Sequence, residues 1–257
     1  MPKDPSDRDD ILPYGEGTYR RRILIVGEPG RVVADLEDDF HRFHVEIEHD
    51  GERVREVCGE ARRFPWSECP GALVPLRAFR GVRLAANLTS ASAGIDARTN
   101  CTHLYDLATL AVAHAAAGRK RRQYDVAVPD LVDERSRATL HQNGVPLLAW
   151  EVHRAEITDP PPYRGQALRG RAFLEWAEAE LDAGTAEAAI VLRRGLFIAN
   201  GRRGDLDLSP TAATLLIWAK NSCHSFTPGI AENALRNVGS SRDFTHRPEG
   251  LLADLAS

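Results

Sequence analysis

The sequence contains little sulfur, with four cysteines and one methionine among 257 residues. The cysteines, Cys58, Cys69, Cys101 and Cys223, are too few and too scattered for a disulfide framework, and no zinc-finger CxxC pair occurs. In a reducing compartment, cysteines of this kind favour a metal-binding or catalytic role. The scarcity of cysteine therefore excludes a disulfide-rich scaffold and leaves open what the thiols do.

Long apolar runs are also missing, since no stretch approaches the roughly 20 apolar residues that a membrane span requires. The N-terminal MPKDPSDRDD is polar and does not resemble a secretory signal, so we expect a cytoplasmic protein without a membrane partner. The net charge is −4. The only dense basic run, 119–122, follows a helical pattern and a glycine, and basic side chains at that place are stabilised by the negative end of the helix dipole. We expect no nucleic-acid partner.

Several catalytic and nucleotide-binding motifs do not occur. The sequence has no GxGxxG, no P-loop, no GxSxG and no HExxH. These absences argue against nucleotide binding, a Rossmann cofactor and serine hydrolysis.

The N-terminal half predicts an antiparallel sheet followed by a helix. Phe43, Val45 and Ile47 alternate with polar residues, and the Asp50-Gly51 pair after them is a hairpin signal. Apolar residues then recur at helical spacing between 72 and 79, and a longer helix is expected from about 101 to 117. A meander with one solvent-facing side therefore precedes the helices.

The second half repeats this order of strands and then helices. Strands are expected at 124–128, 137–144 and 145–153, and helical patterns follow at about 170–182, 185–199, 210–222 and 228–238. The expected fold class is α+β, an antiparallel meander sheet with helices on one side and then a second strand-then-helix half. We predict a flexible leader at 1–18, an α+β metal-site domain at 19–122, and a hairpin plus helical region at 123–257 that could continue the same domain.

Polar residues at element boundaries form the candidate site. Asp39 and His41 lie two residues apart where the meander strand opens, so both side chains leave the same face of the strand. Cys69, Cys101 and His103 precede or begin helical turns. Carboxylate, imidazole and thiolate are the donors that zinc or iron accepts. The sequence predicts a metal site built from Asp39, His41, Cys69, Cys101 and His103. Each residue alone also has a structural explanation, as a buried thiol, a capping histidine or a turn aspartate.

Further residues are assigned supporting roles. Asp38 is a candidate general base, and Asp106, one helical turn after His103, could orient its ring. Cys223 could close over the site, and Arg193 could bind an anionic substrate, although a core cysteine and an exposed helix arginine are the structural alternatives.

The stretches LEDDFHRFHVEIEHDG, RRFPWSECPGA and NCTHLYDLA resemble the hallmarks of a bacterial family known only as a domain of unknown function. The similarity spans roughly residues 15 to 250 and implies no settled activity. It does imply a bacterial protein, and we place it in catabolism as an expectation.

The order of elements over 22–118 is also similar to that of iron–sulfur cluster assembly scaffolds. That resemblance implies that Asp39 and His41 stand where the scaffolds have a cysteine and an aspartate, that Cys69 matches their second cysteine, and that Cys101 and His103 lie near their last one. An oxygen and a nitrogen donor in place of a cysteine and a carboxylate suit zinc or a single iron better than a cluster.

Two classes of function follow from these residues. The first is a zinc or mononuclear iron enzyme of hydrolase or lyase type, acting on a small organic acid or thioester. The second is a non-catalytic carrier of metal, iron–sulfur cluster or sulfur, or an accessory subunit, with a protein partner or a second copy bound. A metal-free α+β protein with core cysteines is the third possibility.

Overall fold

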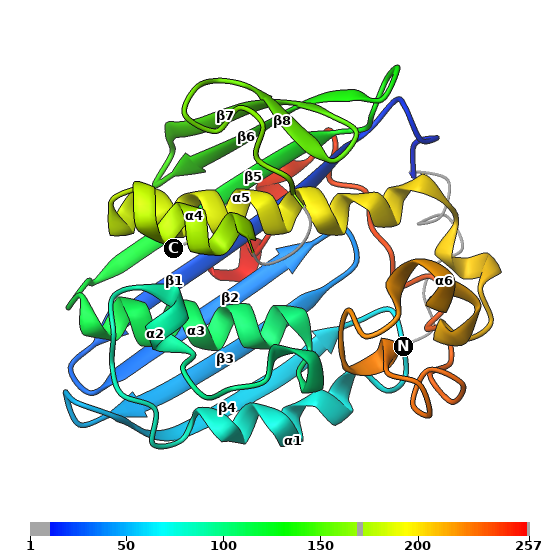
Figure 1. Cartoon of the computed structure of the whole chain (residues 1–257). Coiled ribbons are helices and arrows are strands. Elements are labelled where there is room, and N and C mark those ends of the chain that lie inside the picture. Colours follow the sequence, from blue (N-terminus) through cyan, green and yellow to red (C-terminus); the bar gives the residue numbers. More distant parts are fainter. Residues whose placement is uncertain (1–10, 169–171, 256–257) are drawn as a thin grey trace. The chain divides into compact units, whose positions relative to one another are not determined.

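The protein is an α+β fold whose strands form one antiparallel sheet. The computed structural model describes residues 11–168 and 172–255. Within them the strand order is β4-β3-β2-β1-β5-β6-β7-β8 (Figure 1). The strands are β1 (Thr18–Glu28), β2 (Arg31–Asp38), β3 (Arg42–His49), β4 (Val54–Arg63), β5 (Arg121–Pro129), β6 (Arg135–Gln142), β7 (Val145–His153) and β8 (Glu156–Asp159). The predicted fold class is confirmed.

The chain divides into two compact units that do not follow the sequence order throughout. Unit 2 contains Ile23–Arg122 and Asp205–Ser241, and unit 1 contains the remaining described residues. The change at 122 coincides with the predicted boundary, but the return of 205–241 to the N-terminal unit has no sequence signal that we recognised. Residues 1–10 of the predicted leader lie outside the described residues, and Gly15 and Gly17 donate backbone hydrogen bonds to Asp130.

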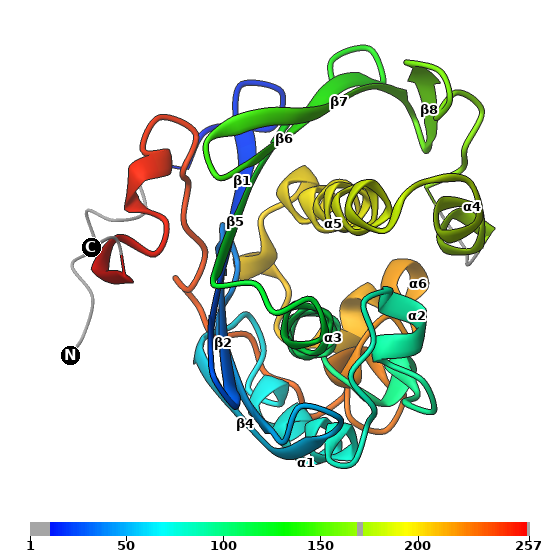
Figure 2. The same cartoon turned by 90° about the vertical axis from the view of Figure 1, so that its left-hand side faces the viewer.

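Unit 2 is a meander covered by helices on one face (Figure 2). β2 pairs with β3, and β3 with β4, in antiparallel register. The apolar side chains of β3 alternate as the sequence predicts, and Phe43, Val45 and Ile47 are fully buried. Helix α3 (Thr102–Ala116) packs against β2 and β3 and supplies most of the cover.

Short helical segments complete unit 2 before α3. They are η2 (Cys69–Ala72), α1 (Leu73–Leu76), η3 (Arg77–Phe79), α2 (Leu88–Ala91) and η4 (Ala97–Thr99). The buried side chains of Leu76 and Phe79 anchor the first three segments in the core. The helical spacing of apolar residues at 72–79 thus corresponds to buried side chains. The backbone there forms three short helical segments in place of one continuous helix.

Unit 1 carries its own strands and two longer helices. α4 (Ala172–Glu180) packs on α5 (Ala183–Ala199), and α5 packs on β6 and β7 (Figure 1). Asp182 caps α5, because its side chain accepts hydrogen bonds from the backbone N–H groups of Gly184 and Thr185. Gly195 lets α5 approach the sheet, since a Cβ there would lie 2.7 Å from Val126 Cγ1.

The two last predicted helices are largely wrong. Residues 210–222 form only η7 (Ala212–Leu215) and the four-residue α6 (Leu216–Ala219), and 228–238 form turns. Residues 211 and 235 form a β-bridge, and the Ala212 N–H donates to the Ala234 carbonyl. The two segments therefore bond to each other, and each also keeps short turns of its own, such as the bond from the Ala234 N–H to the Ile230 carbonyl. The remaining single turns are η5 (Asn200–Arg203), η6 (Leu206–Leu208), η8 (His224–Phe226), η9 (Pro248–Gly250) and η10 (Ala253–Leu255).

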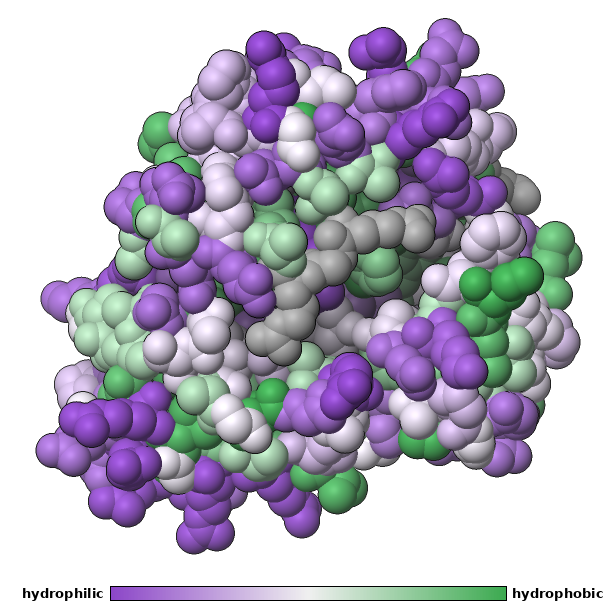
Figure 3. Space-filling model, in the orientation of Figure 1, coloured by the Kyte–Doolittle hydropathy of each residue, from purple (hydrophilic) through white to green (hydrophobic). Residues whose placement is uncertain are grey.

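In the described part of the chain, no helix is both long enough and apolar enough to cross a bilayer. The most exposed large apolar side chains there are Leu208, Ile217 and Trp218, each at least 80% exposed. Hydrophobic residues are visible on the surface in the region of α6 (Figure 3). Such side chains are usually covered in monomeric proteins, so this is a candidate contact surface.

Gly27 in β1 gives the first testable prediction. A Cβ on Gly27 would lie 2.3 Å from the Arg119 carbonyl oxygen and 3.1 Å from the His114 ring, and backbone cannot yield as a side chain does. We expect Gly27→Ala to lower the free energy of unfolding by about 1–3 kcal/mol, the usual effect of overpacking. Urea denaturation measures it. Gly204→Ala is the control, because nothing lies within 4 Å of its Cβ position; equal effects of both substitutions would contradict the packing argument.

Candidate metal site

The turn between β2 and β3 is organised by one buried carboxylate. Asp38 Oδ1 accepts hydrogen bonds from the backbone N–H groups of Phe40 at 2.9 Å and His41 at 2.8 Å. The same oxygen lies 2.9 Å from Nδ1 of the His41 ring. An aspartate that bonds to the backbone two and three residues ahead closes a tight turn, and this turn folds the His41 side chain back over the end of β2.

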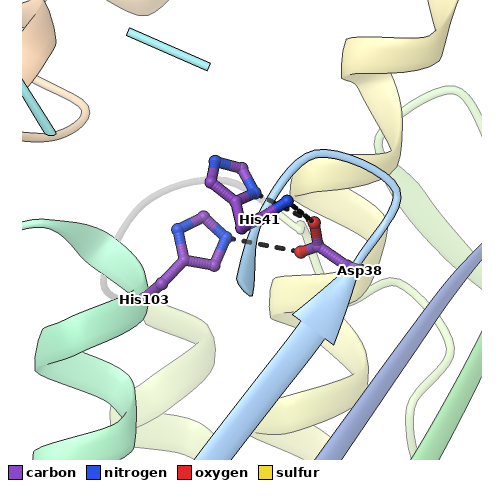
Figure 4. Close-up of side chains that lie close together, drawn as sticks. All are labelled: Asp38, His41 and His103. Carbon is purple, nitrogen blue, oxygen red and sulfur yellow. Dashed lines mark hydrogen bonds and ion pairs between the residues drawn. The ribbon is translucent and has the colours of Figure 1, made fainter. Parts of the chain in front are cut away.

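Helix α3 brings a third polar side chain to this turn. Its N-cap residue is Cys101, and His103 lies in the first turn, which faces the strands because α3 packs on β2 and β3. His103 Nε2 lies 3.5 Å from Asp38 Oδ2. The rings of His41 and His103 have centroids 3.8 Å apart, so the two imidazoles lie face to face over one carboxylate (Figure 4).

Asp38, His41 and His103 form a group with the spacing of metal ligands. Each offers one donor atom, and these atoms all lie within 4.8 Å of one another. A tetrahedral ion with bonds of about 2.1 Å holds its ligand atoms about 3.4 Å apart. The contacts of 2.9 and 3.5 Å around Asp38 bracket that value. Small side-chain movements therefore suffice to admit an ion among the three residues.

The group is buried and backed by aromatic rings. The side chains of Asp38, His103 and His41 are 0%, 4% and 12% exposed, so access is limited and occurs beside His41. Phe43 stacks against both histidines, with centroids 5.8 and 5.7 Å away. A low-dielectric environment strengthens the attraction between a carboxylate and a bound cation.

Acidic residues surround the group on β2 and its turn. Asp35, Glu37, Asp38 and Asp39 are all less than 9% exposed. Arg63 pairs with Glu37 at 3.2 Å, and His44 Nδ1 lies 2.9 Å from Asp35. The cluster gives the turn an acidic environment, which attracts a divalent cation.

The structure places Asp38 in this group where the sequence predicted Asp39. The prediction assumed that residues 39 and 41 continue a strand, but β2 ends at Asp38 and residues 39 and 40 form a bend. The Asp39 side chain is fully buried and is not one of the three grouped donors. The ligand role of Asp39 stays a prediction. If Asp38 binds the ion, Asp38 cannot also serve as the general base that the sequence predicted. The Asp-x-Phe-His turn was the signal that we overlooked.

Cys101 lies on the opposite side of the His103 ring from Asp38. Its Sγ is 3.9 Å from Nδ1 of His103, whereas Nε2 faces the carboxylate. Since the ring stands between the two contacts, one ion bound at Nε2 cannot also be reached through the Nδ1 side. The Cys101 sulfur at Nδ1 instead leaves Nε2 as the ring nitrogen that is available to an ion. The structure does not place Cys101 among the three grouped donors, and a single site that includes Cys101 stays a prediction.

Cys69 and Cys223 lie near Cys101. Burial, with a smaller contribution from Cys223, raises the pKa of the Cys69 thiol to about 12. Burial likewise raises the pKa of Cys101 well above its usual range, with added contributions from Cys223 and Cys69. Hydrogen bonds from Thr102 to Ser222 and from Ser225 to Cys69 hold the segments of the three cysteines together. The thiols of the metal-free protein are protonated at neutral pH, because the pKa of each is raised.

The free energy of unfolding should fall at high pH because these thiols resist deprotonation in the folded protein. An unfolded Cys69 loses its proton near pH 9.0, whereas the folded protein keeps it until about pH 12. The unfolded state therefore gains relative stability as pH rises through this window, by about 1.4 kcal/mol per pH unit for one such thiol. Urea denaturation between pH 8 and pH 10 should show a falling free energy of unfolding, to a smaller degree in Cys69→Ser. Cys58→Ser is the control, because Cys58 is exposed, and an unchanged slope in Cys69→Ser would contradict the assignment.

The other predicted residues lie outside the group of three. Asp106 lies on α3 one turn after His103 and is half-buried, and its role stays a prediction. The Arg193 guanidinium lies 5.4 Å from the centroid of the Phe173 ring, in unit 1. Unit 1 also has a cavity of about 430 Å³, with Asp130, Ser136, Arg154 and Arg203 among its lining residues. The residues that line this cavity do not include those of the metal group.

A comparison with models of known protein families gives no match for the chain, and a search of curated proteins gives none. The functional argument therefore depends on the geometry of the residues themselves.

Proposed function

We propose that this chain is a metal-dependent enzyme in which Asp38, His41 and His103 hold one zinc or iron(II) ion. The observation that supports the proposal is the convergence of three donor atoms within 4.8 Å at a buried turn. Two histidines and one carboxylate are a donor set used by catalytic zinc and by mononuclear iron(II) sites. Three protein ligands leave coordination positions open for water or substrate, which distinguishes a catalytic site from a closed structural one.

The reaction that we propose is hydrolysis or a lyase reaction on a small organic acid or thioester. A bound ion of this kind polarises a carbonyl group and lowers the pKa of bound water. The protein's own residues fix the donors: the turn holds Asp38 and His41, and the first turn of α3 holds His103. The limited exposure beside His41 favours a small substrate. The acid or thioester class derives from the sequence alone.

A metal-content measurement with matched histidine variants tests the proposal. His44 is a suitable control, because His41 and His44 each hold an aspartate at 2.9 Å, but only His41 belongs to the three-donor group. Protein purified without a metal-binding tag should contain zinc or iron, and His41→Ala should contain one equivalent less than His44→Ala. Equal metal content in the two variants would contradict the proposed ligand set.

Activity tests the catalytic part separately. Metal-loaded protein should cleave members of a panel of small thioesters and esters, or eliminate from small hydroxy acids. A chelator and His41→Ala should each abolish the turnover, while His44→Ala retains it. A protein that binds the ion at these residues but turns over no compound in the panel would contradict the enzymatic proposal and leave the site as a binding site.

A second candidate function is a metal or sulfur carrier, or an accessory subunit. The observation that favours it is the exposure of Ile217 and Trp218 on α6, since such side chains suit contact with a partner protein or a second copy. The similarity of the N-terminal half to iron–sulfur scaffolds supports the same candidate. Transfer of the bound metal to an acceptor apoprotein, without turnover of any small substrate, would favour it over the enzyme.

A further inference from the structure

Three segments far apart in sequence converge around the cysteines of unit 2. The His224 N–H donates to the Asn100 carbonyl at 3.0 Å, and Thr102 Oγ1 donates to the Ser222 carbonyl at 2.9 Å. These two bonds hold Cys223 alongside Cys101 at the start of α3. The sequence analysis offered Cys69 and Cys101 as ligands of one site and Cys223 as a residue that could close over it.

The third segment, η2, is joined to the same place. Ser225 Oγ donates to Cys69 Sγ at 3.4 Å, and a Cβ on Gly71 would lie only 2.7 Å from the His224 ring. Cys69 thus lies against the segment that carries Cys223. The three segments that carry the cysteines are therefore hydrogen-bonded to one another.

Two of the sulfurs have polar neighbours. Ser225 Oγ donates a hydrogen bond to Cys69 Sγ, and Cys101 Sγ lies 3.9 Å from His103 Nδ1. A hydrogen bond to sulfur stabilises a thiolate more than a thiol, because charge-assisted hydrogen bonds are the stronger ones. The Ser225 hydroxyl therefore favours a negatively charged sulfur at Cys69, which is the form that binds a metal ion.

We propose that Cys69, Cys101 and Cys223 form a second metal site, which takes a soft cation such as copper(I) or zinc. Three sulfur donors select such ions over magnesium, calcium or manganese. Binding replaces the three thiol protons, which pass to solvent, by three metal–sulfur bonds. The thiol site lies on the Nδ1 side of His103 and the Asp38 group lies on the Nε2 side, so the imidazole ring lies between the two sites. This proposal does not depend on the enzymatic one.

Binding requires a modest rearrangement. In the described part of the chain, only Asp38, His41 and His103 have all donor atoms within 4.8 Å of one another. Zinc bound to sulfur at about 2.3 Å needs sulfurs about 3.8 Å apart. Rotation of the Cys223 side chain can supply this movement, because Cys223 lies in extended chain before η8 and not inside a helix or strand.

Cadmium titration of the reduced full-length protein tests the site, because cadmium–thiolate bonds absorb in the ultraviolet. Wild type and Cys58→Ser should develop the same band, which saturates at one equivalent, since Cys58 is exposed on β4. Cys223→Ser and Cys69→Ser should lose high-affinity binding and the band. Circular dichroism checks that the variants fold, and having two variants keeps the test valid if one does not.

The outcomes separate the two sites. His41→Ala should leave the cadmium band unchanged, whereas Cys223→Ser should leave binding at the Asp38 group unchanged. A wild-type protein without a thiolate band, or a Cys223→Ser protein that titrates like Cys58→Ser, would overturn the thiol site. Neither result would affect the proposed zinc or iron site.

Discussion

His103→Ala is expected to weaken the binding of zinc or iron(II) by more than about 100-fold, since loss of a group that merely supports a ligand already costs 10–100-fold. The reason is geometric, because His103 is the only donor of the three that comes from α3 and it closes the group against Asp38. Without it, the remaining donors come from one turn and offer two bonds. Competition with a coloured chelator measures the affinity.

His114→Ala is the matched control for that experiment. His114 is a buried histidine on the same helix, about 16 Å further along its axis at 1.5 Å per residue. Both substitutions remove a buried imidazole from α3, so both should lower stability. Only His103→Ala should release the ion, and loss of metal in both variants would assign the effect to unfolding.

Arg63→Met is expected to lower the free energy of unfolding by about 3–5 kcal/mol, the usual cost of removing one partner from a buried ion pair. The Arg63 side chain is 13% exposed and the Glu37 carboxylate it pairs with is 9% exposed. Its guanidinium also donates to the backbone carbonyls of Asp38, Asp39 and His41 in the metal-site turn, and to that of Ser240. Urea denaturation measures the change.

The same substitution should also weaken metal binding, because Arg63 holds the turn that carries Asp38 and His41. Arg137 is the control. Its side chain is 66% exposed and pairs with Glu151 at 3.1 Å, so Arg137→Met should cost about 0–1 kcal/mol and leave the metal affinity unchanged. Similar losses in both variants would show that Arg63 has no special role in the turn.

Hydrophobic periodicity in the sequence predicted the helices and strands whose burial pattern repeats over consecutive residues. Helix α3 and strands β3, β6 and β7 lie close to their expected positions, because their alternating or helical burial is written in consecutive residues. The helix predicted at 228–238 is absent. Only short turns form there, and the groups that follow them bond to distant segments, as the Leu235 carbonyl does to the Ser67 N–H. Periodicity says nothing about such partners.

The candidate site was predicted in part for the same reason. The sequence singled out His41 and His103 because both stand where an element begins, and the structure places both in the group of three donors. Asp38 replaced Asp39 there because a single bend decides which of two adjacent carboxylates faces the histidines. The approach of Cys223 to Cys101 depends on the fold of 205–241 onto unit 2, which nothing in the local sequence indicates.

Anomalous diffraction from crystals grown with zinc or iron(II) tests the central claim most directly. The ion should appear as a peak bonded at about 2.0–2.2 Å to an Asp38 oxygen and to one ring nitrogen each of His41 and His103. The direct contact between Asp38 and His41 should then be replaced by two metal bonds. A map at saturating metal with no peak among these three residues, and with the 2.9 Å contact retained, would contradict the account.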